Sequence, residues 1–206
     1  MGAVVALDDL LSARRVWRGQ PVGLPASAPE PTGHAALDEV LPAGGWPEHA
    51  LSEILLSADG VGELALVWPT LARLTRAGQR VALVAPPYRL HAPAWHSAGL
   101  DLRQLQVIEA TPRDAFWAAE QCMRSATCKA VLFWPQKPND RALRRLATAA
   151  AEGQCLGIAF RPLCEAANPS PAALRLAIEP NDGAVRVLKS RGGTPQARSI
   201  PLAVAH

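Results

Sequence analysis

The 206-residue sequence lacks the features that would place it outside the class of globular domains. Only 19% of its residues are charged, which excludes a coiled coil, and a hydrophobic fraction of 49% excludes a disordered chain. No apolar run reaches membrane-spanning length, because Asp59 and Glu63 interrupt the longest candidate, residues 54–74. Asp8 and Asp9 interrupt the N-terminal segment, which argues against a secretory signal. We therefore expect one soluble, cytoplasmic domain with short extensions.

The spacing of the cysteines and the net charge do not indicate a ligand. The sequence contains neither a CxxC pair nor histidines at metal-ligand spacing. We expect no metal and no cofactor, and we expect all four cysteines to be reduced packing residues: Cys122, Cys128, Cys155 and Cys164. A net charge of +3 does not by itself indicate a nucleic-acid partner.

Short apolar segments alternate with helical patterns along most of the chain. The pattern predicts strands at 51–57, 80–85, 105–108, 129–134 and 156–160, and helices starting at 63, 92, 114 and 140. Pro69 is expected to kink or restart the first of these helices, and Asp114 to cap the third. Segments 174–179 and 184–189 flank an Asn-Asp-Gly turn. The predicted fold is α/β: a mostly parallel twisted sheet with helices on both faces and a C-terminal antiparallel hairpin.

The extensions differ from this body in composition. Residues 1–19 have the apolar spacing of a helical arm, and residues 20–31 contain four prolines, which is typical of a linker. The core is predicted over residues 32–190. Residues 191–206 are expected to be a flexible basic tail.

A loop between the first predicted strand and the first predicted long helix occupies the position of a nucleotide site. It carries an acidic residue where such a site needs a basic one. A working phosphate loop reads G-x-x-x-x-G-K-[ST], with a lysine for the phosphates and a hydroxyl for magnesium. Here Glu63 replaces the lysine and Leu64 replaces the hydroxyl. A carboxylate about 4 Å from a phosphate oxygen repels it by about 4 kcal/mol at an effective dielectric constant of 20. Ser57, Gly60, Gly62, Glu63 and Leu64 are thus expected to form a degenerate loop that binds no nucleotide.

The ends of the neighbouring strands carry no catalytic acid either. The strand 129–134 runs into Phe-Trp-Pro, and the next acid, Asp140, falls where a helix cap is expected. The strand 80–85 runs into Pro-Pro-Tyr, without a glutamate to activate water. We expect a protein that is not an enzyme.

Several motifs resemble known families. Residues 32–38 (TGHAALD), 44–47 (GGWP) and 51–55 (LSEIL) are similar to the segment that leads into the core of RecA recombinase. The RecA-like family of ImuA is more similar still. Its likeness is carried by residues 16–19 (VWRG), 62–64 (GEL), 85–87 (APP), 117–121 (WAAEQ), 140–146 (DRALRRL) and 189–193 (KSRGG).

The ImuA resemblance implies a non-catalytic adaptor of SOS-induced, error-prone translesion DNA synthesis. It implies binding to an ImuB-type, polymerase-like hub protein, an indirect link to an error-prone replicative-type polymerase, and engagement of RecA. A second hypothesis is an SOS cell-division inhibitor related to SulA, which would bind FtsZ. A third, an active ATP-dependent recombinase, conflicts with Glu63 and Leu64.

Candidate binding residues lie in the N-terminal arm and where the core meets the C-terminal tail. Trp17, with Leu11 and Arg18, marks the arm as a partner-binding helix, because tryptophan is enriched at such anchors. The resemblance to RecA places Lys189 and Arg191 where lysines reach across a filament interface to a neighbour's nucleotide. That role lapses without a nucleotide, and we expect this basic segment to bind a partner instead. The alternatives are an arm that docks on its own body and an ordinary solvated terminus.

The core also carries a group of arginines that could form a binding surface and several tryptophans. Arg141, Arg144 and Arg145 share or adjoin one helix face, and this basic patch would bind either DNA phosphate, weakly, or an acidic partner. The alternative is a solvated helix face. The tryptophans on strand and helix patterns are expected in the core: Trp68, Trp117 and Trp134.

Overall fold

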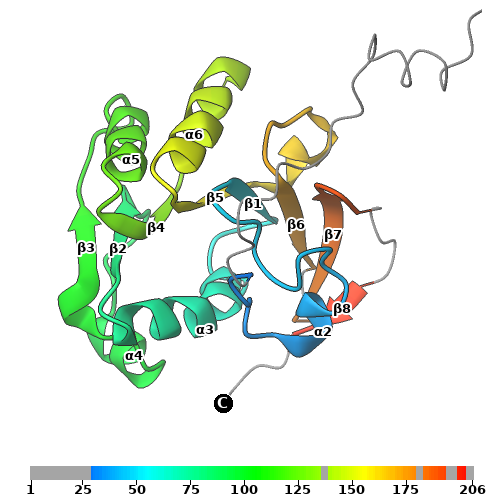
Figure 1. Cartoon of the computed structure of the whole chain (residues 1–206), viewed down its shortest axis with the longest axis horizontal. Helices are drawn as coiled ribbons and strands as arrows, with labels where there is room; N and C mark the ends of the chain where they lie inside the picture. The colour runs from blue at the N-terminus through cyan, green and yellow to red at the C-terminus, as the bar shows by residue number, and fades with distance from the viewer. Residues whose placement is uncertain (1–28, 136–138, 180–182, 194–198, 203–206) are drawn as a thin grey trace, which may run out of the picture.

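The computed structural model describes residues 29–135, 139–179, 183–193 and 199–202, and its strands form one sheet (Figure 1). The eight strands lie in the order β3-β2-β4-β5-β1-β6-β7-β8. All pairs from β3 to β6 are parallel, whereas β6 with β7 and β7 with β8 are antiparallel. The prediction of a mixed α/β fold with a mostly parallel sheet is confirmed.

The elements begin and end close to the predicted positions. The strands are β1 (Leu51–Leu56), β2 (Arg80–Val84), β3 (Leu105–Ile108), β4 (Cys128–Phe133), β5 (Leu156–Pro162), β6 (Leu174–Glu179), β7 (Ala184–Ser190) and β8 (Ser199–Pro201). The helices are α2 (Ala35–Asp38), α3 (Glu63–Arg76), α4 (Ala92–Ser97), α5 (Ala115–Arg124) and α6 (Asp140–Glu152), with 3₁₀ turns η1 (Leu102–Gln104) and η2 (Leu163–Ala167).

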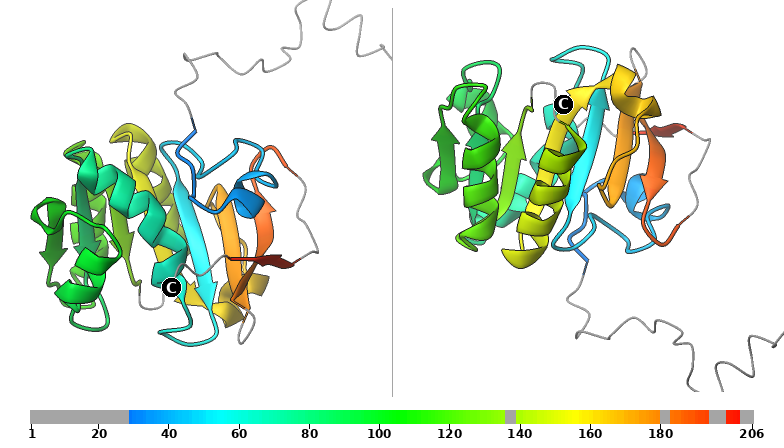
Figure 2. Two further views of the ribbon diagram at one scale, coloured as in Figure 1. Left: turned by 90° about the horizontal axis from the view of Figure 1, so that it is seen from below. Right: turned by 90° about the horizontal axis from the view of Figure 1, so that it is seen from above.

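Helices cover both faces of the sheet. Figure 2 shows α3 in front of the strands in one view and α5 with α6 in front in the opposite view. On the first face Leu66 and Leu71 of α3 pack on strand residues such as Ile54. On the second, Met123 of α5 and Leu143 of α6 do so. Because both faces are buried here, the inner strands β2 and β4 consist largely of apolar residues.

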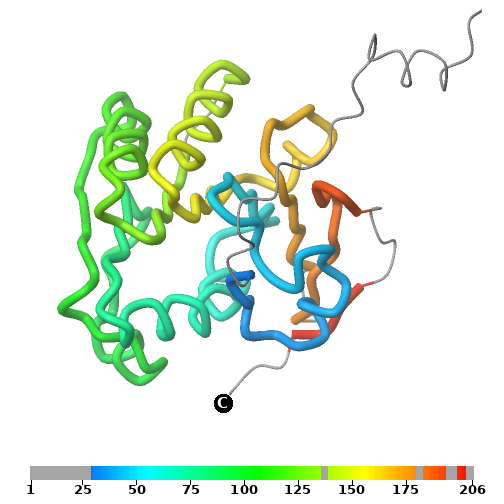
Figure 3. The backbone as a smooth tube through the Cα atoms, in the orientation of Figure 1, coloured from blue at the N-terminus to red at the C-terminus, as the bar shows by residue number. Residues whose placement is uncertain are grey.

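The lead-in motif has a structural explanation. Thr32 donates its N–H to Asp38 Oδ1 at 2.9 Å, which closes the turn before α2. The buried indole of Trp46 donates to Thr70 Oγ1 at 2.9 Å. The Trp46 N–H donates to the Glu30 carbonyl at 2.8 Å. The Trp46 indole bond attaches residues 30–46 to α3, and Figure 3 shows this segment lying across the part of the sheet that carries β6 to β8.

Pro69 lies inside α3, and the helix neither stops nor restarts there. Pro69 lacks the N–H of an ordinary helix position, so the helix loses one hydrogen bond at this point. Gly33 contacts the proline ring so closely that a Cβ at residue 33 would lie 2.3 Å from Pro69 Cβ. Packing of the lead-in on this turn therefore holds the helix together where the sequence predicts an interruption.

The structure corrects three other expectations. Part of the predicted tail is ordered, because Ser199–Pro201 forms β8 and pairs with β7. Trp117 was expected in the core but is 62% exposed on α5. The Asp114 side chain makes no cap bond to a backbone N–H and instead accepts from Thr111 Oγ1 at 2.7 Å.

Some predictions lie outside the described residues. These are the arm 1–19, most of the linker 20–31, and residues 180–182 of the expected turn between β6 and β7. The last residues of the linker belong to the body, because Arg73 pairs with Glu30.

Candidate functional site

The degenerate loop joins the carboxyl end of β1 to the N-terminus of α3. In open parallel sheets this edge is where ligands bind. Gly60 and Gly62 have φ angles of +82° and +100°, a region that strains other residues, so glycine is required at both turns. The loop therefore has a backbone conformation that needs glycine at both positions.

Glu63 fills this loop with its own negative charge. Its side chain is only 7% exposed, and Oε1 accepts the Gly60 N–H at 3.0 Å. An N–H group of such a loop, next to the positive end of a helix dipole, is the kind of donor that holds a phosphate. Here it holds the carboxylate of the first residue of α3. Leu64, at the hydroxyl position, packs against the apolar core.

A buried cation that lines a cavity beside the loop is already paired. Arg161, at the end of β5, donates to Glu53 Oε1 at 2.8 Å and to Glu165 Oε2 at 2.9 Å. A guanidinium committed to two carboxylates does not replace the missing lysine. The loop therefore presents an acid, and no cation within it, to any ligand at this edge.

Three adjoining cavities lie at this edge of the sheet, and residues of the loop line two of them. They have volumes of about 610, 330 and 300 Å³, and Trp134 and Pro87 line all three. Trp134 stacks on Phe160 with ring centroids 4.7 Å apart and an interplanar angle of 18°. Prolines and an aromatic ring thus follow the carboxyl ends of β2 and β4.

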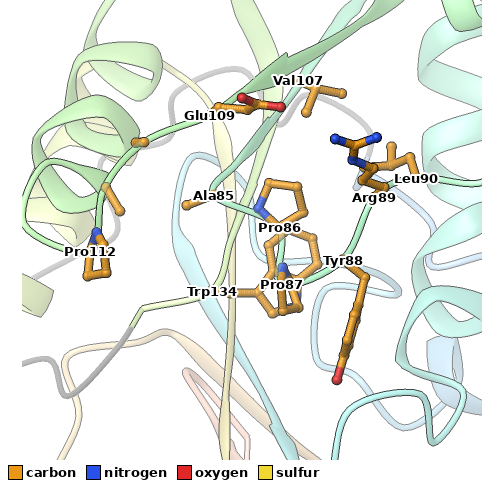
Figure 4. Close-up of a pocket in the computed structure, with 12 residues that line it drawn as sticks. Ala85, Pro86, Pro87, Tyr88, Arg89, Leu90, Val107, Glu109, Pro112 and Trp134 are labelled. Atoms are coloured by element: carbon orange, nitrogen blue, oxygen red, sulfur yellow. The ribbon is translucent and has the colours of Figure 1, made fainter.

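The largest cavity is open and has few charged groups. Figure 4 places Val107 and Glu109 on one side of it and the segment 86–90 on the other. Tyr88 is 69% exposed and Val107 49% exposed, so apolar surface faces solvent at this edge. Exposed apolar area at a concave surface is typical of a protein-binding site.

Backbone strain is located at the centre of this edge. Ala85 directly follows β2 and has a φ of +47°, which is uncommon for a residue with a Cβ. Its N–H donates to the Ile108 carbonyl of the neighbouring strand at 2.9 Å, which holds it in place. The strain aims Pro86 and Pro87 into the shared wall of the cavities, and strained residues of this kind concentrate at functional sites.

The sequence analysis missed a buried ionic cluster centred on Glu53 of β1. Glu53 is fully buried, and besides Arg161 it accepts from Arg175 Nε at 2.8 Å and from Ser170 Oγ at 2.7 Å. Arg175 also donates to three carbonyls of the segment 165–168. A charged residue inside an apolar strand was the available signal, because such a residue needs buried partners. The cluster fixes η2 and the chain after it over the sheet.

The predicted partner-binding residues have mixed outcomes. Leu11, Trp17 and Arg18 lie outside the described residues. Lys189 is half-buried and donates from Nζ to the Ser170 carbonyl at 2.7 Å. Burial, together with Arg175 and Arg191, lowers the pKa of Lys189. Arg191 has an exposed side chain, and its backbone N–H donates to the Ala173 carbonyl at 2.8 Å.

The predicted basic patch is partly used inside the fold. Arg145 pairs with Glu120, a buried residue of α5, and so connects α6 to α5. Arg144 pairs with Asp140 at 3.7 Å on the same helix. Asn139, rather than Asp140, caps α6 through its side-chain oxygen, which accepts the Ala142 N–H at 2.8 Å. Within the described part of the chain, Arg141 is the member of the patch that makes no ion pair.

None of the four cysteines forms a disulfide, and all four lie within the described residues. Cys128 and Cys155 are buried, as expected of packing residues, whereas Cys164 is exposed on η2. Burial raises the pKa of the Cys155 thiol to about 12. Among the described residues no group of three or more His, Cys, Asp or Glu side chains could hold a metal.

Comparison with known proteins adds little. No protein-family model matches the chain, and no curated protein matches it. One similar solved structure is that of SulA from Pseudomonas aeruginosa, which is 23% identical, covers 54% of this chain and 97% of that chain, and superposes with a TM-score of 0.46. In the described residues no helix has the length and apolar character needed to cross a membrane.

Proposed function

We propose that this protein is a non-catalytic, RecA-like adaptor of SOS-induced, error-prone translesion DNA synthesis. Its partner is an ImuB-type, polymerase-like hub protein, through which it acts with an error-prone replicative-type polymerase, and RecA is a further partner. The observation that carries the proposal is the Glu63 carboxylate, which accepts the Gly60 N–H inside the former phosphate loop.

The electrostatics of the loop support a non-catalytic role. A triphosphate placed here would lose the Gly60 N–H to Glu63 and would meet a carboxylate instead of a lysine. Two like charges about 4 Å apart repel by about 4 kcal/mol at an effective dielectric constant of 20. This repulsion alone lowers affinity by about three orders of magnitude.

The surface beside the loop supports protein binding instead. Its cavities are lined by prolines and aromatic rings, and Tyr88 projects into solvent beside them. Tyrosine and tryptophan provide large contact areas with little loss of conformational entropy, so they concentrate at interface hot spots. The motifs shared with ImuA favour a translesion partner over the FtsZ partner that the SulA alternative would require.

The experiment is co-purification of the full chain with an ImuB-type protein, combined with calorimetric titration of Mg-ATP. We expect association with the hub protein and no nucleotide binding at micromolar concentrations. Tyr88→Asp should weaken the association by about tenfold or more, because it places a charge in an apolar contact. The matched control is Arg103→Ala, at an exposed residue of η1 beyond the amino end of β3.

Three results would overturn the proposal. The first is a failure to associate with the hub protein. The second is micromolar binding of Mg-ATP, which would favour a recombinase or ATPase. The third is capture of FtsZ together with filamentous growth on expression, which would favour the division-inhibitor alternative.

A further inference from the structure

The smallest of the three cavities lies directly beside Glu63 and has an aromatic lining. It occupies about 300 Å³ between the N-terminal half of α3, α4 and residues 86–91. Trp68 and Trp95 meet edge to face at one side, with ring centroids 6.3 Å apart and an interplanar angle of 77°. Tyr88 and Trp134 contribute to the remaining wall. Four aromatic side chains therefore converge on one small space.

Two polar atoms at this cavity are left without partners. Glu63 Oε2 and Trp68 Nε1 are both buried and make no hydrogen bond within the described structure. Both residues line the cavity, and Glu63 is 7% exposed as a whole. Native proteins satisfy the great majority of buried polar groups, so two orphans at one cavity indicate that a partner group is supplied from outside. The acceptor is an acid, and the donor is an indole N–H.

We infer that this cavity binds an arginine side chain of a partner protein. A guanidinium is planar, stacks on aromatic faces and donates to carboxylates, so it matches the rings and the free oxygen of Glu63 together. The Trp68 N–H then has a carbonyl oxygen of the same partner segment as its acceptor. The inference deepens the proposed function and rests on it, because it assumes that this edge of the sheet is the protein-binding face.

Other occupants fit less well. An anion would meet the Glu63 carboxylate, and an apolar side chain would leave both polar atoms unsatisfied. Arg89 of the same chain also lines the cavity, but its side chain is exposed and it makes no ion pair in the described part of the chain. Arg89 is therefore the residue of this chain that could occupy the cavity in place of a partner's arginine. Because neither orphan atom is exposed to water, entry of a guanidinium requires the outer wall at residues 86–90 to shift.

The test uses the full chain and two short peptides, acetyl-Gly-Arg-Gly-amide and its citrulline counterpart. Citrulline has nearly the same shape as arginine but carries no charge. Binding is followed by NMR through the indole N–H signal of Trp68, assigned with Trp68→Phe. We expect the arginine peptide to bind at least about tenfold more tightly than the citrulline peptide, because a charge-assisted hydrogen bond is lost in the latter.

Variants identify the group responsible. Glu63→Gln should abolish the preference for arginine, while its amide oxygen still accepts the Gly60 N–H and keeps the loop folded. Glu48→Gln, at an exposed glutamate beside the amino end of β1, is the matched control and should keep the preference. Thermal unfolding of each variant verifies the fold. Trp68→Phe lacks the Trp68 indole N–H, so its binding is followed through the indole N–H signal of Trp95, which lines the same cavity, and affinity should fall although an aromatic ring is retained.

Three results would overturn the inference. These are equal binding of both peptides, a preference that persists in Glu63→Gln, and binding that occurs only in Arg89→Ala, which would make Arg89 the natural occupant. Co-purification with the hub protein is measured separately. If it succeeds while the peptides fail, the arginine site is wrong and the proposed function stands. If co-purification itself fails, the proposed function is wrong whatever the peptides do.

Discussion

Two buried glutamates on the same strand–loop–helix unit are treated differently by the fold. Glu53, in the middle of β1, has Arg161, Arg175 and Ser170 as partners, and both of its oxygens are bonded. Glu63, at the start of α3, has one bond from a loop N–H and one oxygen without a partner. A carboxylate such as Glu53, whose two oxygens are both bonded within the fold, holds elements together. A carboxylate such as Glu63, with one unbonded oxygen at a cavity, can still bind a ligand. The contrast separates a structural acid from a candidate binding acid.

The largest effect is expected from Glu53→Ala. The change leaves two buried guanidinium groups facing each other without their shared carboxylate, and removing one partner of such a cluster costs about 3–5 kcal/mol. Urea unfolding followed by circular dichroism measures the free energy of unfolding. Glu39→Ala, at an exposed residue, is the control and should change it by less than about 0.5 kcal/mol. A loss below about 1 kcal/mol for Glu53→Ala would contradict the structural role.

The alkylation rate of Cys155 measures how often β5 opens, and so tests whether the Glu53 cluster holds this strand in place. Cys155 directly precedes β5, which carries Arg161, and burial raises its pKa from 9.0 to about 12. At pH 8.5 the folded thiol keeps its proton, so iodoacetamide reaches a reactive thiolate only when β5 opens. We expect exposed Cys164 to react first, and Cys155 to react at least about tenfold faster in Glu53→Ala than in the wild type. Mass spectrometry of the labelled peptides measures both rates, and an unchanged Cys155 rate would refute the coupling.

The same thiol gives a pH dependence with a defined sign. A raised pKa in the folded state means that the folded protein keeps a proton which the unfolded chain releases. The contribution of Cys155 to stability is therefore complete below pH 9.0, and it is lost as the pH rises toward about 12. Between these values the free energy of unfolding should decrease less steeply in Cys155→Ala than in the wild type.

The smallest effect is expected from Glu63→Gln. The amide keeps an oxygen for the Gly60 N–H. The charge at the helix N-terminus is lost, and the unpaired buried carboxylate oxygen is replaced by an uncharged NH₂ group, which costs less to bury. These terms oppose each other, so the free energy of unfolding should change by less than about 1 kcal/mol. Urea unfolding decides the point. A loss as large as that of Glu53→Ala would make Glu63 a second structural acid and would remove the contrast.

Local patterns predicted most of the secondary structure. The apolar runs of β2 and β4 are followed within two residues by Pro86 and Pro135, so a single sequence identifies them as short buried strands. β8 was missed because three residues, Ser199–Pro201, are too few to show alternation and depend on β7 for pairing. Trp117 was misplaced because the helical pattern of α5 does not reveal which neighbours cover it.

The candidate site was predictable only in part. The replacement of lysine by Glu63 is visible in the sequence, but its bond to Gly60 depends on the loop geometry. The Glu53 cluster joins residues 108 and 122 positions apart, and no local pattern contains such pairings. The cavities depend on how strand ends meet, since Trp134 and Pro87 come together only in the folded sheet.

The contact between Gly33 and Pro69 sets an evolutionary constraint. A methyl group at residue 33 would overlap the Pro69 ring, and the φ of +87° at Gly33 disfavours any side chain there. Neither position can therefore drift alone: a homologue that gains a side chain at 33 must also carry a smaller residue in place of the proline. In an alignment of relatives the two columns should change together, although one lies in a turn and the other inside a helix.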